Sequence, residues 1–195
     1  MMVPAGAQHA SDSERGMEVM LRCSVPDRPG ALATLAGTIG EAGGDIQAVD
    51  VVESGRGHAL DDLVVVIDGP QQLSVLVEKI QGLEGFELVH AGPSRGHPGD
   101  AVTRLAVGLE AILNGAMTLE HGLEASLGGL LRASQATFVD AADVPQATGK
   151  RLVLAVDHRV LVLTRDYRFT DTERERAEAI LRVALEAVSA RASLA

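Results

Sequence analysis

Neighbouring carboxylates are the first residues of this chain whose types could do chemistry. Asp61 and Asp62 follow each other in an apolar, extended segment, and neighbours in a strand point to opposite faces, so these two do not form one acid pair. If residues 54–57 form a hairpin turn, Asp50 lies opposite Asp61 or Asp62 on the paired strand. Like charges directly opposite each other on paired strands are destabilising. Either a cation, an arginine or a ligand amine therefore lies beside these carboxylates, or the register keeps them apart.

Metal binding and nucleophilic catalysis find little support in the sequence. No P-loop, dinucleotide fingerprint or nucleophile elbow is present. The histidines are scattered without the spacing of metal ligands: His9, His58, His90, His97, His121 and His158. Cys23 is the only cysteine, and on the apolar face of a predicted strand it is expected to be a buried core thiol. The residues therefore predict no catalysis, no metal and no cofactor.

The most specific pattern is residues 25–32, Val-Pro-Asp-Arg-Pro-Gly-Ala-Leu, which join an apolar strand to an amphipathic helix. Pro26 suits the end of a strand, and Asp27 is expected to cap the helix that begins near Pro29. Gly30 has no Cβ, so another group can approach the backbone there. The predicted buried face of the helix is Leu32, Leu35, Ala36 and Ile39. From the spacing alone, a capped helix with no further role is an equally good interpretation.

Around this turn the pattern predicts the order strand, helix, strand, strand, helix, strand. Val19, Leu21, Cys23 and Val25 alternate along the first strand. The order is that of the ferredoxin-like split βαβ arrangement, an antiparallel sheet with two helices on one face. Residues 63–67 are apolar without a break, so the far face of the sheet is also expected to be covered, by a second subunit or by a second domain.

Residues 93–100 are rich in proline and glycine and predict a linker to a second α+β domain over residues 101–190. That domain is expected to hold two helices, three strands and a last helix, which Thr170 and Glu173 open as a capping box. Glycines recur at every seventh position, 108, 115, 122 and 129, which fits either a close-packed stripe or coincidence.

Composition limits the classes of function. The chain has 195 residues, a formal net charge of −10 and 2% aromatic residues, and it has no dense Lys/Arg run, which disfavours nucleic-acid binding. No apolar run approaches the length of a membrane span. Residues 1–16 lack an apolar signal core, so we expect a disordered tail on a cytoplasmic protein.

Residues 17–92 resemble an ACT domain, a small regulatory module that binds amino acids. The resemblance rests on the turn at residues 27–30, on the strand entry Gly-Gly-Asp-Ile at residues 43–46 and on the order of elements. It implies a site between the first strand–helix loop and the start of the second strand, often at a subunit interface, where N–H groups of a helix start suit a carboxylate. The corresponding residues are Asp27, Arg28, Pro29, Gly30, Ala31, Leu32, Asp45 and Ile46. Many amino-acid-binding members have Asn at the position of Asp45, and an ionised Asp cannot donate a hydrogen bond, so the ligand differs or is absent.

Residues 101–190 resemble a shortened GAF domain, mainly through the strand–turn–strand from residue 151 and the segment 165–173 that leads into a helix. GAF domains often hold small ligands in a cavity, but no ligand residue is transferred here. The sequence thus predicts an α+β protein, a ferredoxin-like βαββαβ ACT domain followed by a small GAF-like domain. We expect a non-catalytic homodimer that binds an amino acid or a similar small carboxylate, without nucleic acid or membrane. The alternative is a dimerisation or scaffold module that binds a protein partner, and an enzyme with an unrecognised site comes third.

Overall fold

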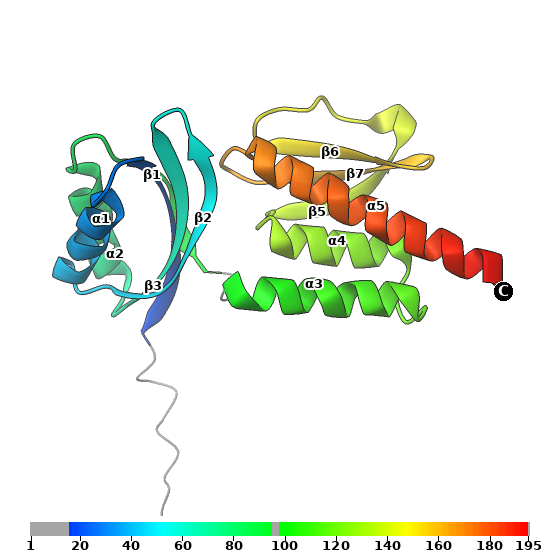
Figure 1. The fold of residues 1–195 in the computed structure, drawn as a ribbon, viewed down its shortest axis with the longest axis horizontal. Helices are drawn as coiled ribbons and strands as arrows, with labels where there is room; N and C mark the ends of the chain where they lie inside the picture. The colour runs from blue at the N-terminus through cyan, green and yellow to red at the C-terminus, as the bar shows by residue number, and fades with distance from the viewer. Residues whose placement is uncertain (1–15, 95–97, 195) are drawn as a thin grey trace, which may run out of the picture.

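The computed structural model describes residues 16–94 and 98–194. Figure 1 shows two α+β domains side by side, the N-terminal one in blue to green and the C-terminal one in green to red. The predicted tail lies outside the described residues except for Gly16. Within the described ranges, no helix is both long enough and apolar enough to cross a membrane.

The N-terminal domain is a four-stranded antiparallel sheet with two helices on one face. Its elements are β1 (Met17–Pro26), α1 (Ala31–Glu41), β2 (Asp45–Gly55), β3 (His58–Ile67), α2 (Pro70–Gln81) and β4 (Glu87–Pro93). The strands pair in the order β2-β3-β1-β4, and each pair is antiparallel. The ferredoxin-like arrangement is therefore confirmed for this domain.

Helices α1 and α2 cover the face that the alternation predicts. The alternating residues of β1, namely Val19, Leu21, Cys23 and Val25, are at most 2% exposed. They share one hydrophobic core with Leu35 and Ile39 of α1 and with Leu76 and Ile80 of α2. The prediction is wrong for Leu32, which is 39% exposed. Because α1 begins at Ala31, its buried face runs through Ala31, Leu35 and Ile39 instead.

The hairpin between β2 and β3 fixes the register of the carboxylates. Arg56 and Gly57 have positive φ angles, 56° and 84°, as a tight two-residue turn requires. The turn pairs Asp50 with Asp62, and on the other side of β3 Asp62 pairs with Arg22 of β1. Of the alternatives that the sequence leaves open, an arginine beside the paired carboxylates is the one observed.

The C-terminal domain packs three helices with a three-stranded antiparallel sheet of order β5-β7-β6. Its elements are α3 (Pro98–Leu113), α4 (Leu119–Leu130), β5 (Gln135–Asp140), η2 (Ala141–Asp143), β6 (Arg151–Val156), β7 (Arg159–Thr164) and α5 (Asp171–Leu194). Helices α4 and α5 share one hydrophobic core with the sheet. The linker is shorter than the predicted residues 93–100, because β4 extends to Pro93 and the helix α3 already begins at Pro98, a residue that the first turn tolerates.

Two of the four regularly spaced glycines allow α3 and α4 to approach each other closely. A Cβ on Gly108 or Gly122 would collide with a side chain of the facing helix. Gly115 lies in the turn between these helices with a φ of 76°. Gly129, by contrast, has no neighbouring atom within 4 Å of the position of a Cβ. Close packing therefore explains part of the pattern and leaves Gly129 without a structural reason.

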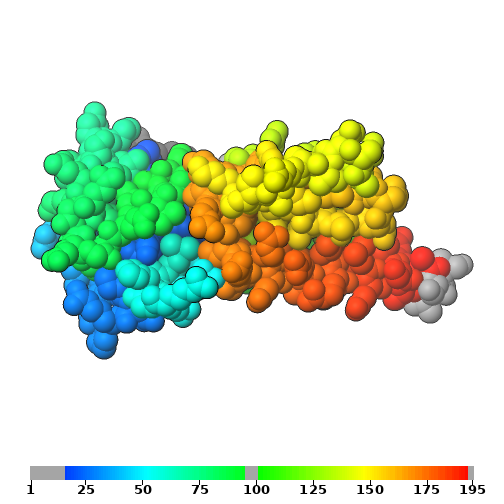
Figure 2. Space-filling model, turned by 90° about the horizontal axis from the view of Figure 1, so that it is seen from above, coloured from blue at the N-terminus to red at the C-terminus, as the bar shows by residue number. Residues whose placement is uncertain are grey.

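The C-terminal domain covers the far face of the N-terminal sheet. Met20 and Val64 are 3% and 0% exposed although they point away from α1 and α2. Figures 1 and 2 show the start of α5, in orange, against the β2 hairpin, in cyan. Of the two covers predicted for this face, the second domain is the one present, so residues 63–67 no longer argue for a dimer.

Candidate ligand-binding site

The loop between β1 and α1 forms an exposed helix start. Residues 27–30 are all exposed, and Gly30 is the N-cap of α1 at a φ of 86°, a left-handed conformation that favours glycine. A Cβ on Gly30 would have no atom within 4 Å, so the space beside the backbone is open. The first N–H groups of a helix have no intrahelical acceptor, so this end of α1 suits a carboxylate.

Asp27 does not cap α1, contrary to the prediction. The helix has no side-chain cap, and the backbone N–H of Asp27 instead donates to the carbonyl oxygen of Gly57 at 2.9 Å. The N–H of Ala31 donates to the carbonyl oxygen of Arg28 at 3.2 Å. The left-handed Gly30 starts the helix later than the pattern suggests, which moves Asp27 out of the capping position. These bonds fix the loop against the β2–β3 hairpin.

Asp45 and Ile46 lie at the opposite end of α1. Asp45 begins β2 and is exposed, and its Oδ2 accepts a hydrogen bond from Gln47 Nε2 at 2.6 Å. Ile46 is half-buried against the core under α1 and α2. Because β1 and β2 both run antiparallel to β3, the start of β2 lies level with the start of β1, away from the loop that follows Pro26.

The predicted ligand residues therefore form two separate groups within one chain. Residues 27–32 lie at one end of α1 and residues 45–46 at the other, and the 11 residues of this helix span about 16 Å at 1.5 Å per residue. A small amino acid is too short to contact both ends of that helix. The two groups can line a single ligand only if they come from two copies of the chain.

A buried carboxylate lies beneath the helices on the same sheet, where sequence reasoning assigned no role. Asp61 is 2% exposed and pairs with Cys23 of β1 and Val51 of β2. Its Oδ1 has no hydrogen-bond partner among the described residues. Burial, followed by the charges of Asp62 and Asp50, raises the pKa of Asp61. Burial, with Asp61 and Asp62, also raises the pKa of Cys23 to about 12, so the thiol stays protonated in the core, as predicted.

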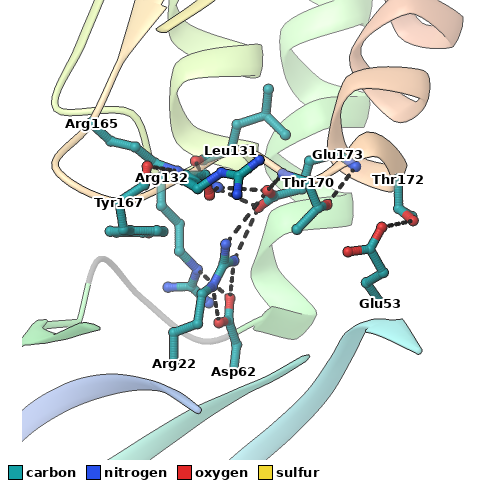
Figure 3. A network of polar contacts seen from close by, with 11 residues as sticks. Arg22, Glu53, Asp62, Leu131, Arg132, Arg165, Tyr167, Thr170, Thr172 and Glu173 are labelled. Carbon is teal, nitrogen blue, oxygen red and sulfur yellow. Dashed lines mark hydrogen bonds and ion pairs between the residues drawn. The ribbon is translucent and has the colours of Figure 1, made fainter. Parts of the chain in front are cut away.

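A buried ion network joins the two domains on the other face of the sheet (Figure 3). Arg22 of β1 is 1% exposed, and its Nε and Nη2 donate to Oδ1 and Oδ2 of Asp62 at 2.6 and 2.8 Å. The same Nη2 donates to Oε1 of Glu173 at 3.0 Å, across the domain boundary. Arg132 Nε lies 3.5 Å from Asp62 Oδ2. A charge on the N-terminal sheet is thus neutralised by the first turn of α5.

Glu173 also closes that turn. Its N–H donates to Thr170 Oγ1 at 3.0 Å, and its Oε2 accepts from the N–H of Thr170 at 2.8 Å, which confirms the predicted capping box. Its Oε1 accepts from Arg165 Nη1 at 2.9 Å. Burial alone would raise the pKa of Glu173, but the hydrogen bonds and charges of Arg165 and Arg22 outweigh it and lower the pKa from 4.5 to about 2.

Arg165 holds the loop that precedes α5. Its guanidinium donates to the carbonyl oxygens of Leu131, Tyr167 and Arg168 at 2.7, 3.3 and 2.6 Å. The Tyr167 ring centroid lies 4.2 Å from Arg165 Cζ and 4.8 Å from Arg22 Cζ, within cation–π distance of both. The guanidinium groups of Arg22 and Arg165 donate to acceptors inside the protein, so the network is a structural joint rather than an open binding site. The buried hydroxyl of Tyr167 has no hydrogen-bond partner among the described residues.

Sequence reasoning found Glu173 as a cap but missed its arginine partners. One signal was available, because Arg22 stands between residues of a strand whose far face was predicted to be covered. An arginine on such a face requires a buried carboxylate, and an arginine was one of the partners considered for Asp50 and Asp61 or Asp62. The position of Glu173 could not follow from local patterns, since it lies 151 residues from Arg22.

Comparison with known proteins identifies the N-terminal domain. Residues 19–85 match the sequence model of the ACT domain family, and this part of the chain is an ACT domain, as the resemblance implied. The NAD-dependent malic enzyme of Geobacillus stearothermophilus is 27% identical over 90 residues, which cover 46% of this chain. The chain spans 17% of the length of that relative.

Solved structures with low sequence identity are also similar. The ACT domain from the GTP pyrophosphokinase of Chlorobium tepidum is 15% identical with a TM-score of 0.34, and it covers 40% of this chain and 97% of its own. The regulatory subunit of aspartate kinase from Thermus thermophilus is 16% identical with a TM-score of 0.36, and it covers 90% of this chain and 95% of its own. The GAF-like assignment of the second domain remains a prediction.

Proposed function

We propose that this chain is a non-catalytic regulatory protein that binds an amino acid, or a similar small carboxylate, through its ACT domain. The observation that carries the proposal is the start of α1 at Gly30, where a left-handed glycine, open space and the first helical turn coincide in an exposed loop. Such a helix start offers N–H donors and a favourable dipole to a carboxylate. Arg28, exposed in the same loop, adds a positive charge.

The ligand lies at an interface between two copies of the chain. The separation of residues 27–32 from residues 45–46 by the length of α1 supports this arrangement, because one copy presents the loop and the other presents the start of β2. In such a site Asp45 would accept a hydrogen bond from the ligand amine rather than donate one. Ligand binding to the ACT domain would then regulate the GAF-like second domain.

The test compares two glycines with the same backbone conformation. Gly30 and Gly85 have φ angles of 86° and 82°, so an alanine at either position carries similar strain, about 1–2 kcal/mol. A thermal-shift screen with the twenty amino acids selects the ligand, and titration calorimetry measures its affinity for wild type, Gly30→Ala and Gly85→Ala. We expect Gly30→Ala to lose binding and Gly85→Ala to keep it. Equal affinities in the three proteins would place the site elsewhere.

A protein-binding scaffold without a small ligand is the second candidate. It is favoured by exposed apolar side chains on the edge strand β2 and on α1, since Val49, Val51 and Leu32 are 43%, 55% and 39% exposed. The Asp45 carboxylate is also already engaged by Gln47. A full-length protein that is dimeric by light scattering, but that no amino acid stabilises, would decide for the scaffold.

A further inference from the structure

A cavity of about 530 Å³ lies between the two domains, on the opposite side of the ACT sheet from the predicted loop site. Its walls come mainly from β2, α3, α4 and α5, and they include Arg22, Asp62 and Glu173 of the ion network. The volume falls within the range of small-molecule sites, about 300–1,000 Å³. Nothing in the ACT assignment requires a cavity here.

One side of the cavity is apolar. Val52 of β2, Leu105 of α3, Leu130 of α4 and Ile180 of α5 line it together. Val52 is 4% exposed, and the other three are half-buried. Four elements from two domains thus present aliphatic side chains to one space, which suits a branched hydrocarbon group better than water.

The polar side of the cavity carries two opposite charges, on Asp50 and Arg176. Asp50 and Arg176 are both exposed, and neither side chain makes an ion pair or a hydrogen bond with any residue in the described ranges. Among the other charges at this wall, Arg22 is bound by Asp62 and Glu173, and Arg132 Nε lies 3.5 Å from Asp62 Oδ2. Next to its apolar wall, the cavity thus presents the Asp50 carboxylate and the Arg176 guanidinium, for which the described residues supply no partner.

Gly129 gives a second, independent reason to regard this space as a site. It lies in α4, where glycine costs about 1 kcal/mol relative to alanine, and its φ is not of the left-handed kind. It does not serve the close packing that explains Gly108 and Gly122, since a Cβ would meet nothing within 4 Å. It is exposed and lines the cavity, so a side chain there would have open space at the cavity wall.

From these features we infer that the interdomain cavity is a binding site for an α-amino acid with an apolar side chain. Asp50 receives the ammonium group, Arg176 receives the carboxylate, and the side chain packs against Val52, Leu105, Leu130 and Ile180. The ligand touches both domains and lies beside the Arg22–Glu173 contact, so its binding also strengthens the domain interface. This site is separate from the proposed loop site and does not depend on it.

The experiment is titration calorimetry on the full chain with L-leucine, L-isoleucine, L-valine and L-methionine. The blocking variant is Gly129→Leu, in which a good helix former fills the cavity. The matched control is Gly37→Leu, because Gly37 lies in α1, also has open space at its Cβ and does not line the cavity. We expect the control to bind like wild type and Gly129→Leu to lose at least a hundredfold in affinity while its melting temperature does not fall.

Charge variants test the assigned roles with analogues of leucine. Asp50→Asn should lower the affinity for leucine at least tenfold but leave the affinity for 4-methylpentanoate, which lacks the amine, unchanged. Arg176→Gln should lower the affinity for both leucine and 4-methylpentanoate and leave the affinity for 3-methylbutylamine, which lacks the carboxylate, unchanged. Equal losses for all three compounds in both variants would overturn these roles.

Gly30→Ala separates this inference from the proposed function. Binding that survives in Gly30→Ala and disappears in Gly129→Leu supports the cavity, whatever happens at the loop. Binding that disappears only in Gly30→Ala places the amino acid at the loop and overturns the cavity site. No heat from any of the four apolar amino acids also overturns it, even if a polar amino acid binds at the loop.

Discussion

Arg22 and Glu173 are 151 residues apart in the sequence, yet Nη2 of the arginine lies 3.0 Å from Oε1 of the glutamate. The contact joins the central part of the ACT sheet to the first turn of α5. Each domain contributes a buried charge, and each charge is neutralised partly by the other domain. The interface therefore depends on both partners being present.

Removing the arginine should be costly. Arg22→Met keeps the length of the side chain but leaves Asp62 and Glu173 buried without it, so we expect the free energy of unfolding to fall by about 3–5 kcal/mol. Urea denaturation measures the change. The control is Lys79→Met, which breaks an exposed pair with Glu41 at 3.8 Å and should cost less than about 1 kcal/mol. Similar losses in the two variants would show that the network adds little.

The pKa of Glu173 predicts how stability depends on acid. The group has a pKa of 4.5 in an open chain and about 2 in the folded protein, so folding favours its charged form. The stabilisation is complete above the unfolded value and is lost as the pH falls from about 4.5 towards 2, by an amount on the order of 3 kcal/mol. Urea denaturation across this window should show a smaller loss for Glu173→Gln than for wild type. Glu186→Gln, an exposed change on the same helix, should follow wild type.

Replacing Asp61 or Asp62 by asparagine should change the free energy of unfolding in opposite directions. The pKa of Asp61 is raised, so the folded state favours its protonated form, and stability falls as the pH rises above the unfolded pKa. Asp61→Asn should therefore raise the free energy of unfolding at neutral pH, by about 1 kcal/mol, and should gain less in mild acid. Asp62→Asn weakens the bond to Arg22 and should destabilise the protein at neutral pH. A loss of stability in Asp61→Asn at neutral pH would mean that this carboxylate has a partner.

Alanine substitutions at two glycines of α4 should change stability in opposite directions. Gly122→Ala places a Cβ against Ile112 of α3, so we expect a loss of about 1–3 kcal/mol from overpacking. Gly129→Ala meets open space and gains helix propensity, up to about 1 kcal/mol. Thermal or urea unfolding of the two single variants decides the matter. A destabilised Gly129→Ala would mean that its backbone is needed for another contact.

Much of the ACT domain could be predicted because its local signals agree with its tertiary structure. The alternation in β1, the turn glycines before β3 and the glycines after α1 mark element boundaries directly. The capping box at Thr170 and Glu173 works for the same reason, since both partners lie within one helical turn. Leu32 was misplaced because the phase of α1 depends on where the left-handed Gly30 starts the helix.

The features that could not be predicted depend on contacts between residues far apart in the sequence and on which surface covers the sheet. Periodicity showed that both faces of β3 are apolar, but it could not decide whether a domain or a subunit covers the far one. The candidate site was predicted as one group, and the structure separates it because α1 lies between Gly30 and Asp45. The interdomain cavity combines β2 with three helices from beyond residue 97, so no local pattern in the sequence could reveal it.

The shared role of Glu173 limits how this protein can be divided. The ACT domain ends at β4 along the chain, but its far sheet face carries Met20 and Val64, which the second domain covers, and Arg22, which needs Glu173. If the ACT segment were transferred alone to another protein, its apolar sheet face would be exposed, and Arg22 would lose its contact with Glu173 while keeping Asp62. Residues 17–93 and 98–194 therefore depend on each other for a complete interface, although along the chain they form two separate domains.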